Sequence, residues 1–173
     1  MELAHKIRNV QDFPKPGIGF KDITTLVGDA EALREAVQKM LDFFKDEKID
    51  KIIGIESRGF IFAAIMAHEL GVGMIPVRKP GKLPYKTIAA TYDLEYGTDS
   101  LEIHIDALNK NESVLIVDDL LATGGTVEAT AKLVEKLGGT VVGCCFLIEL
   151  DFLHARDKLQ NYKIKSLIHF DSE

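Results

Sequence analysis

Tryptophan is absent from this 173-residue sequence, and cysteine (two residues) and proline (five) are scarce. With so few prolines and a hydrophobic share of 46%, the composition excludes collagen-like and intrinsically disordered chains. Positive charge is also limited, because 21 Lys and Arg face 27 Asp and Glu for a net charge of −6. Such a chain has no broad basic surface for a phosphate backbone, so we expect no nucleic-acid partner.

Long apolar runs are missing as well. The longest, FIFAAIMA and VVGCCFLI, are far below the roughly 20 residues with which a helix crosses a bilayer, so we expect no membrane span. The first 13 residues mix charged and apolar side chains, which is not the pattern of a secretory signal. Cys144 and Cys145 are neighbours, so a disulfide between them would be strained and metal-ligand spacing is absent. We therefore predict reduced thiols in a cytoplasmic protein.

The length fits a single domain, predicted over residues 1–173, and no repeat or linker divides it. Glycines and apolar runs mark two strand–turn–helix–strand units, and crossovers of this kind predict a parallel sheet with helices on its faces. The first unit has strands at 51–55 and 73–79 around a helix that ends at Gly71; the second has strands at 114–117 and 141–148 around a helix at 126–137.

Three further elements are predicted around these units. Residues 2–10 have helical spacing of apolar side chains, and a longer helix is expected at about 30–47 with Asp29 as its N-cap. Residues 86–105 alternate between apolar and polar around a turn at 96–99. This alternation predicts an antiparallel hairpin that projects from the core.

The most informative segment is VLIVDDLLATGGT, residues 114–126. A buried strand delivers Asp118 and Asp119 to the carboxyl end of the sheet, where open α/β sheets bind their ligands. The following turn is rich in glycine and hydroxyl groups and leads into a helix N-terminus, which favours an anion. Carboxylates beside a single-phosphate turn suit a ribose diol next to a 5′-phosphate. The turn residues are Ala122, Thr123, Gly124, Gly125 and Thr126.

Two common nucleotide motifs are excluded here. The Lys that follows the second glycine of a triphosphatase loop is missing, and neither GIGFKD nor GVGMIP has the third glycine of a dinucleotide fingerprint. Metal-ligand spacing is likewise absent among the histidines. We predict no metal site built by the protein alone.

VLIVDDLLATGGT resembles the phosphoribosyl-pyrophosphate (PRPP) signature of the type I phosphoribosyltransferases, in the form found in members that use adenine. The likeness continues in the family's order through DFPKPGIGFKDIT, ESRGF, VRKPGKLP, YDLEYGTDSLEIH and IEL. It implies an α/β fold with a mostly parallel five-stranded sheet, an N-terminal hood at about 1–28 and a flexible loop at about 80–105. It also implies that adenine and PRPP react to give AMP and pyrophosphate, with Mg²⁺ as cofactor, in a homodimer.

The resemblance also assigns roles to residues. Asp118 and Asp119 would hold the ribose hydroxyls and carry Mg²⁺, the turn at 122–126 would bind the 5′-phosphate, and Glu95 would close over the site and handle the base proton. A cis peptide is expected at Glu56–Ser57. The pyrophosphate would be bound by Ser57, Arg58, Gly59, Arg78, Lys79 and Lys82. The base would be bound by Ile18, Gly19, Phe20, Lys21 and Leu150.

Several alternatives stay open at this point. Without the resemblance, the three cations at 78, 79 and 82 are typical of a solvated loop. Glu95 would then be an outward-facing carboxylate on a strand, and Phe20 would be part of the core. Gly19 stands where the family usually has Val or Leu, which leaves xanthine or another purine as a possible base. A further alternative is a transcriptional regulator that binds PRPP without catalysis. The acidic net charge argues against it, because such a regulator has to bind DNA.

Overall fold

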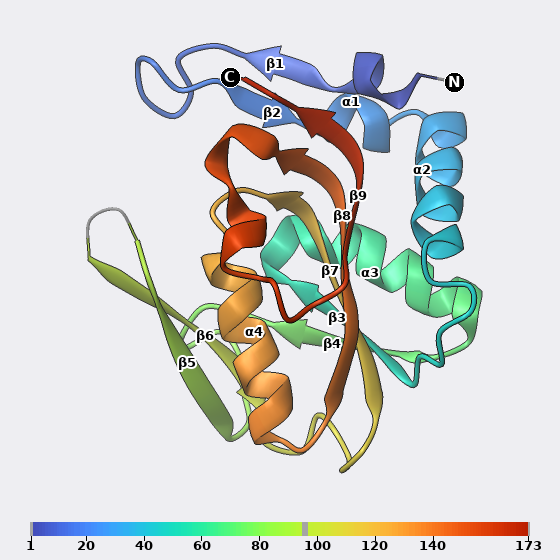
Figure 1. Cartoon of the computed structure of the whole chain (residues 1–173), viewed down its shortest axis with the longest axis vertical. Coiled ribbons are helices and arrows are strands. Elements are labelled where there is room, and N and C mark those ends of the chain that lie inside the picture. The colour runs from blue at the N-terminus through green and yellow to red at the C-terminus, as the bar shows by residue number, and fades with distance from the viewer. Residues whose placement is uncertain (1, 95–96, 173) are drawn as a thin grey trace.

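The computed structural model describes residues 2–94 and 97–172. Its centre is a five-stranded sheet in the order β4-β3-β7-β8-β9, and every neighbouring pair of strands is parallel (Figure 1). The predicted fold class is therefore confirmed. The strands are β3 (Lys51–Ile55), β4 (Gly73–Val77), β7 (Ser113–Leu121), β8 (Thr140–Leu150) and β9 (Ile164–Phe170).

Helices connect these strands as the crossover pattern predicted. Helix α3 (Glu56–Leu70) links β3 to β4 and ends at Gly71, whose φ of +66° is readily adopted by glycine. Helix α4 (Gly125–Lys136) links β7 to β8, and Gly138 follows it with φ +84°. In the part of the chain that the structure describes, no helix has the length and apolar character to cross a membrane.

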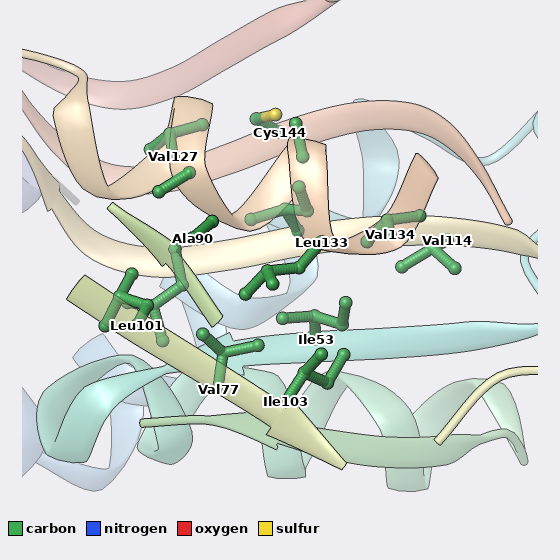
Figure 2. Close-up of a cluster of buried hydrophobic side chains, with 14 of the residues drawn as sticks. Ile53, Val77, Ala90, Leu101, Ile103, Val114, Val127, Leu133, Val134 and Cys144 are labelled. Carbon is green, nitrogen blue, oxygen red and sulfur yellow. The ribbon is translucent and has the colours of Figure 1, made fainter. Parts of the chain in front are cut away.

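The core lies on both faces of the sheet. On one face, α4 and the β5–β6 hairpin (Thr87–Asp93 and Thr98–His104) pack against side chains such as Ile53, Val77 and Val114 (Figure 2). On the other face, α3 and α2 (Ala30–Asp42) pack against alternate residues of the same strands. Alternation along parallel strands therefore produces two apolar layers, both of them buried.

The adjacent cysteines illustrate this alternation. Cys144 belongs to the core layer under α4, and Cys145 belongs to the layer under α2 and α3. Both thiols are free, and because neighbouring strand residues point to opposite faces, they face away from each other. Burial raises the pKa of the Cys144 thiol to about 12 and also raises the pKa of Cys145.

We expect both thiols to be inert in the folded protein, because only an exposed thiolate reacts readily. A chromogenic disulfide reagent should label two thiols per chain in denaturant. In native buffer the labelling rate should fall to the rate of global unfolding. Rapid labelling of a folded sample would contradict this picture of the β8 core.

The N-terminal region differs from the prediction. Residues 2–10 form a short 3₁₀ turn, η1 (Leu3–Lys6), and a strand, β1 (Arg8–Val10), instead of one helix. Strand β1 pairs antiparallel with β2 (Phe20–Asp22), and Arg8 Nη2 lies 2.8 Å from Asp22 Oδ2 across the pair. Tertiary pairing has overridden a local helical pattern. Figure 1 shows this hairpin crossing above the ends at which β8 and β9 finish.

Helix α2 begins as predicted but ends early. Asp29 caps its N-terminus by accepting bonds from the backbone N–H groups of Glu31 and Ala32. The helix stops at Asp42, not near residue 47, because the chain tightens and buries Phe44 against Gly143 of β8. A Cβ on Gly143 would lie 2.3 Å from Phe44 Cε1, so the strand has glycine where the ring packs. A short helix, α1 (Thr24–Val27), precedes α2.

The predicted hairpin is present as β5 and β6, paired from Thr87↔His104 to Asp93↔Thr98. It extends away from the sheet in Figure 1, yet Ala90, Leu101 and Ile103 near its base are buried in the core (Figure 2). The hairpin is thus anchored against α4. Its connection includes residues 95 and 96, outside the described range.

Candidate active site

A cavity of about 270 Å³ lies at the carboxyl ends of β3 and β7, the edge that the sequence predicted. The structure brings together residues from four separate predicted motifs here. Four lining residues had no site role predicted from the sequence, although Tyr92 and Leu101 belong to the alternating hairpin pattern: Ile55, Glu56, Tyr92 and Leu101. The lining residues are Ile55, Glu56, Ser57, Arg58, Lys79, Tyr92, Leu101, Asp118, Asp119 and Thr126.

Two buried carboxylates form the floor of this cavity. Asp118 and Asp119 are 9% and 4% exposed, and strand β7 runs through both of them rather than ending at Val117. Burial raises the pKa of Asp118 well above its usual range, with the neighbouring Asp119 as a second cause. Burial also raises the pKa of Asp119, against the lowering effect of Arg58. The protein therefore keeps this acid pair at a cost in stability, as functional sites often do.

Arg58 connects the acid pair to the N-terminal hairpin. Its Nε lies 2.9 Å from Asp119 Oδ2, and its guanidinium carbon lies 5.0 Å from the centre of the Phe20 ring. The ion pair does not have hydrogen-bond geometry, so Asp119 Oδ2 is a buried oxygen with no hydrogen-bond partner among the described residues. An unsatisfied buried acceptor is costly in a protein interior, and it marks a position suited to a ligand hydroxyl or a cation.

Helix α3 approaches β7 closely at Gly59. A Cβ at this position would lie 2.7 Å from Asp118 Oδ1 and 3.2 Å from Asp118 Cα, so only glycine fits without movement. The expected cis peptide at Glu56–Ser57 is not found, and the cis bond in the described chain is Phe13–Pro14. The sharp turn from β3 into α3 is made instead by Glu56 at φ +32°, a strained conformation for a residue with a side chain.

The cations predicted for pyrophosphate have acidic neighbours. Arg78 Nη2 lies 3.8 Å from Glu56 Oε2, and Lys79 Nζ lies 2.8 Å from Asp99 Oδ2. The Arg78 Nε atom is buried without a hydrogen-bond partner among the described residues, while Lys82 is exposed between β4 and β5. Lys79 lines the cavity together with the acid pair, whereas Arg78 is not among the lining residues and its guanidinium lies 5.6 Å from the centre of the Phe60 ring.

The predicted phosphate turn lies between β7 and α4. Gly124 has φ +85°, and Gly125 and Thr126 begin the helix, so their backbone N–H groups are at its positive end. Thr123 is exposed and Ala122 half-buried. The turn is enclosed on two sides: a Cβ on Gly125 would meet Tyr92 Cδ2 at 3.0 Å, and one on Gly124 would meet Ala155 and Leu159 at 3.3–3.4 Å.

The residues predicted for the base lie beside the cavity rather than in its lining. Phe20 and Lys21 are on β2; Phe20 makes an edge-to-face contact with Phe13, with ring centres 5.1 Å apart. Lys21 is buried, and its Nζ lies 4.5 Å above the Phe170 ring. Leu150 ends β8 and pairs with Phe170 on β9. Ile18 is exposed and Gly19 half-buried before β2, and Glu95 lies outside the described residues.

A second polar cluster lies at the ends of β8 and β9. Glu149, Asp151 and His169 place potential ligand atoms within 4.8 Å of one another, a grouping that could hold a metal ion. Both Glu149 oxygens, however, already accept bonds from Arg156. Sequence analysis included IEL at 148–150 only as part of the resemblance and gave Glu149 no role.

Comparison with known proteins decides the family. The model of the phosphoribosyl transferase domain family matches residues 25–171. The adenine phosphoribosyltransferase of Clostridium perfringens is 59% identical over 99% of each chain. The chain belongs to the adenine phosphoribosyltransferase family. This membership confirms the resemblance inferred from the motifs.

Solved structures of adenine phosphoribosyltransferases have the same fold. The enzyme from Thermoanaerobacter pseudethanolicus superposes with a TM-score of 0.95 at 54% identity, covering 98% of both chains. That from Saccharomyces cerevisiae, solved with adenine and an imino-altritol bisphosphate, has a TM-score of 0.90 at 40% identity over 96% of both chains. Both structures therefore share the fold of this adenine phosphoribosyltransferase family member over nearly its whole length.

Proposed function

We propose that this protein transfers the phosphoribosyl group of PRPP to adenine, giving AMP and pyrophosphate. The observation that carries the proposal is the buried acid pair Asp118–Asp119, which lines one cavity together with Arg58, Lys79 and Thr126. Its full-length relatives are named adenine phosphoribosyltransferases at 56–59% identity. The arrangement matches the chemistry of PRPP, a ribose diol with a phosphate at its 5′ end and a pyrophosphate at its anomeric carbon.

In this proposal each part of PRPP has its own set of groups. Asp118 and Asp119 accept hydrogen bonds from the ribose 2′- and 3′-hydroxyls, and Asp119 Oδ2, which is ion-paired with Arg58 but accepts no hydrogen bond from the described residues, supports this role. Backbone N–H groups and hydroxyls of the turn at 122–126 bind the 5′-phosphate at the start of α4. The pyrophosphate is bound by Ser57, Arg58, Gly59, Arg78, Lys79 and Lys82.

For the base, we propose that adenine stacks between Phe20 and Leu150. Backbone groups around Ile18, Gly19 and Lys21 read its edge, so residues 1–28 act as a hood over the site. Glu95, on the loop segment at about 80–105, closes over the base and accepts the proton that its attacking nitrogen loses. Closure excludes water from the reacting carbon.

The reaction is a displacement at the anomeric carbon of the ribose. A bond forms from the adenine nitrogen to this carbon, and the bond from the carbon to the pyrophosphate oxygen breaks. Arg58 and the cations at 78, 79 and 82 stabilise the negative charge that develops on the leaving group. Because Asp118, Asp119 and the phosphate turn fix the ribose, catalysis rests mainly on positioning and electrostatics.

Mg²⁺ is the proposed cofactor, bound together with the pyrophosphate. Carboxylate oxygens are suitable ligands for it, and Asp118 and Asp119 would hold it directly or through water. The buried Asp119 Oδ2, which accepts no hydrogen bond from the described residues, fits this assignment. When bound, Mg²⁺ neutralises charge on the departing pyrophosphate.

The decisive test is nucleotide formation from PRPP and Mg²⁺ with adenine, hypoxanthine, guanine and xanthine in parallel. We expect AMP from adenine and no nucleotide from the other three bases. Turnover of an oxopurine instead would move the specificity away from adenine and point to Gly19. Binding of PRPP without turnover of any base would favour a regulator.

Assembly and location complete the proposal. We infer a homodimer that works in the cytoplasm, and the two unpaired, buried thiols are compatible with a reducing compartment. Sedimentation equilibrium tests the dimer: a mass near twice 19.2 kDa supports it, and a mass near 19.2 kDa contradicts it.

A further inference from the structure

An ion pair between a buried carboxylate, Glu149, and a half-exposed guanidinium, Arg156, lies outside the proposed substrate groups, at the end of β8. Glu149 is 3% exposed, and its two oxygens accept hydrogen bonds from Arg156 Nε at 2.7 Å and Arg156 Nη2 at 2.8 Å. The Ser166 hydroxyl donates a third bond, at 2.5 Å, to Glu149 Oε2. This two-pronged geometry is the strongest form of a carboxylate–guanidinium pair.

The pair is strong enough to keep the carboxylate charged. Burial by itself raises the pKa of Glu149, but the bonds from Arg156 and Ser166 outweigh it, so the pKa of Glu149 is lowered overall. A buried charge without such partners would be strongly unfavourable. Glu149 is therefore a fixed anchor point at the end of the sheet.

This anchor holds the segment that follows β8. Arg156 belongs to the 3₁₀ turn η3 (Ala155–Asp157), which follows η2 (Asp151–Leu153), and its Nη1 also donates to the Ile164 carbonyl at the start of β9. The guanidinium thus links the ends of β8 and η3 to β9. His154, between the two turns, has φ +51°, so this link holds a backbone that is strained at one residue.

The anchored segment forms one wall of the phosphate turn. A Cβ placed on Gly124 would meet Leu159 Cδ1 at 3.3 Å and both Ala155 Cβ and its carbonyl oxygen at 3.4 Å. Ala155 and Leu159 are buried in the same core layer as Val127 of α4. A shift of η3 would therefore displace the turn that precedes α4.

We infer that Glu149 is a positioning residue that, through Arg156 and η3, fixes the phosphate turn at Gly124 for the 5′-phosphate of the nucleotide. This inference rests on the proposed function, because it takes 122–126 as the phosphate site. Glu149 also precedes Leu150, so the same anchor holds one predicted wall of the base site. The pyrophosphate groups at Arg58 and Lys79 lie on other elements and are not attached to it.

The test compares the two ends of the site by calorimetry. Glu149→Gln retains the shape of the side chain but replaces one carboxylate oxygen with an amide NH₂ group. In either orientation of the amide, one of the two hydrogen bonds from Arg156 is lost. We expect the Kd for AMP to rise by at least about tenfold, since small misplacements of a binding group have large effects. The Kd for pyrophosphate with Mg²⁺ should stay within about twofold, because its groups do not depend on η3.

Controls separate positioning from a general loss of structure. Lys48→Gln breaks the Lys48–Asp50 ion pair, 3.2 Å long, in the loop before β3 and should leave both affinities unchanged. If Glu149→Gln does not fold, Ser166→Ala removes one bond to the same carboxylate and should raise the Kd for AMP by about two- to fivefold.

Each outcome decides the inference. A selective loss of AMP affinity supports it. Equal losses for AMP and pyrophosphate, or an unchanged Kd for AMP, overturn it and leave the proposed function standing. Failure of the unaltered protein to bind AMP would overturn the proposed function as well.

Discussion

Replacement of both site acids, Asp118→Asn with Asp119→Asn, is expected to reduce kcat/KM for AMP formation by at least about 10³-fold. The asparagines retain the shape of the side chains, but they cannot carry the charge that holds the ribose hydroxyls and Mg²⁺. The fold should survive, because Asp118 Oδ1 accepts one bond, from Asp119 N, that an amide oxygen can also accept. Steady-state assays of nucleotide formation, with circular dichroism as the folding check, measure both effects.

The same double variant should be more stable than the unaltered protein at neutral pH. Burial raises the pKa of Asp118 and Asp119, so the folded state binds their protons more tightly than the unfolded state does. Their favourable contribution is complete below the unfolded pKa and is lost as pH rises through the folded pKa. We expect the melting temperature of the variant to exceed that of the parent by a few degrees near pH 7, with the difference vanishing below about pH 4.

Asp50 provides a matched control whose pKa shift has the opposite sign. A hydrogen bond from Ser113 N lowers the pKa of Asp50, and Lys48 is the second cause. The contribution of Asp50 to stability is therefore present above the unfolded pKa and is lost as pH falls. Asp50→Asn should therefore leave activity unchanged and slightly lower the stability at neutral pH.

Full turnover by the Asp118/Asp119 double variant would refute the assignment of the acid pair.

The sheet was predictable because its signals are local. Buried β-branched runs at 51–55 and 114–117, each followed by an apolar helix, determine the crossovers, and they appear as β3 and β7. The end of α3 was predictable for the same reason, because Gly71 directly follows the helix in the sequence. Strand β9 was not located from the sequence, although five strands were expected, because polar Ser166 stands at one of its buried positions and only the 3₁₀ turns η2 and η3, without an α-helix, connect it to β8.

What the sequence did not reveal depends on contacts between distant segments. Strand β1 exists because Arg8 to Val10 pair with β2, and no local preference of those residues announces it. The Glu149–Arg156 ion pair joins the end of β8 to η3 across the 3₁₀ turn η2, and neither residue lies in an α-helix, so the spacing of seven residues did not predict the contact. The cis bond expected at Glu56–Ser57 from the resemblance is replaced by a positive φ at Glu56.

Gly59→Ala is a substitution for which packing and local propensity predict opposite results. Inside an exposed helix, alanine in place of glycine stabilises by about 1 kcal/mol. Here a Cβ would lie 2.7 Å from Asp118 Oδ1 and 3.2 Å from both Asp118 Cα and the Val117 carbonyl oxygen. Two of these neighbours are backbone atoms of a central strand, so α3 must move away from β7. We expect a net loss of stability of about 1–3 kcal/mol.

The activity should fall further than the stability. Moving α3 displaces Ser57 and Arg58 relative to Asp118 and Asp119, and a shift of about 1 Å between binding groups lowers kcat/KM by about 10²-fold. Gly73→Ala is the matched control, because its Cβ would meet only the flexible Lys51 side chain, at 3.3 Å, at the start of edge strand β4. Thermal unfolding and kcat/KM measured on both variants separate the two effects. A Gly59→Ala protein that is more stable than the parent and fully active would mean that helix propensity outweighs the contact, and that α3 does not set the geometry of the acid pair.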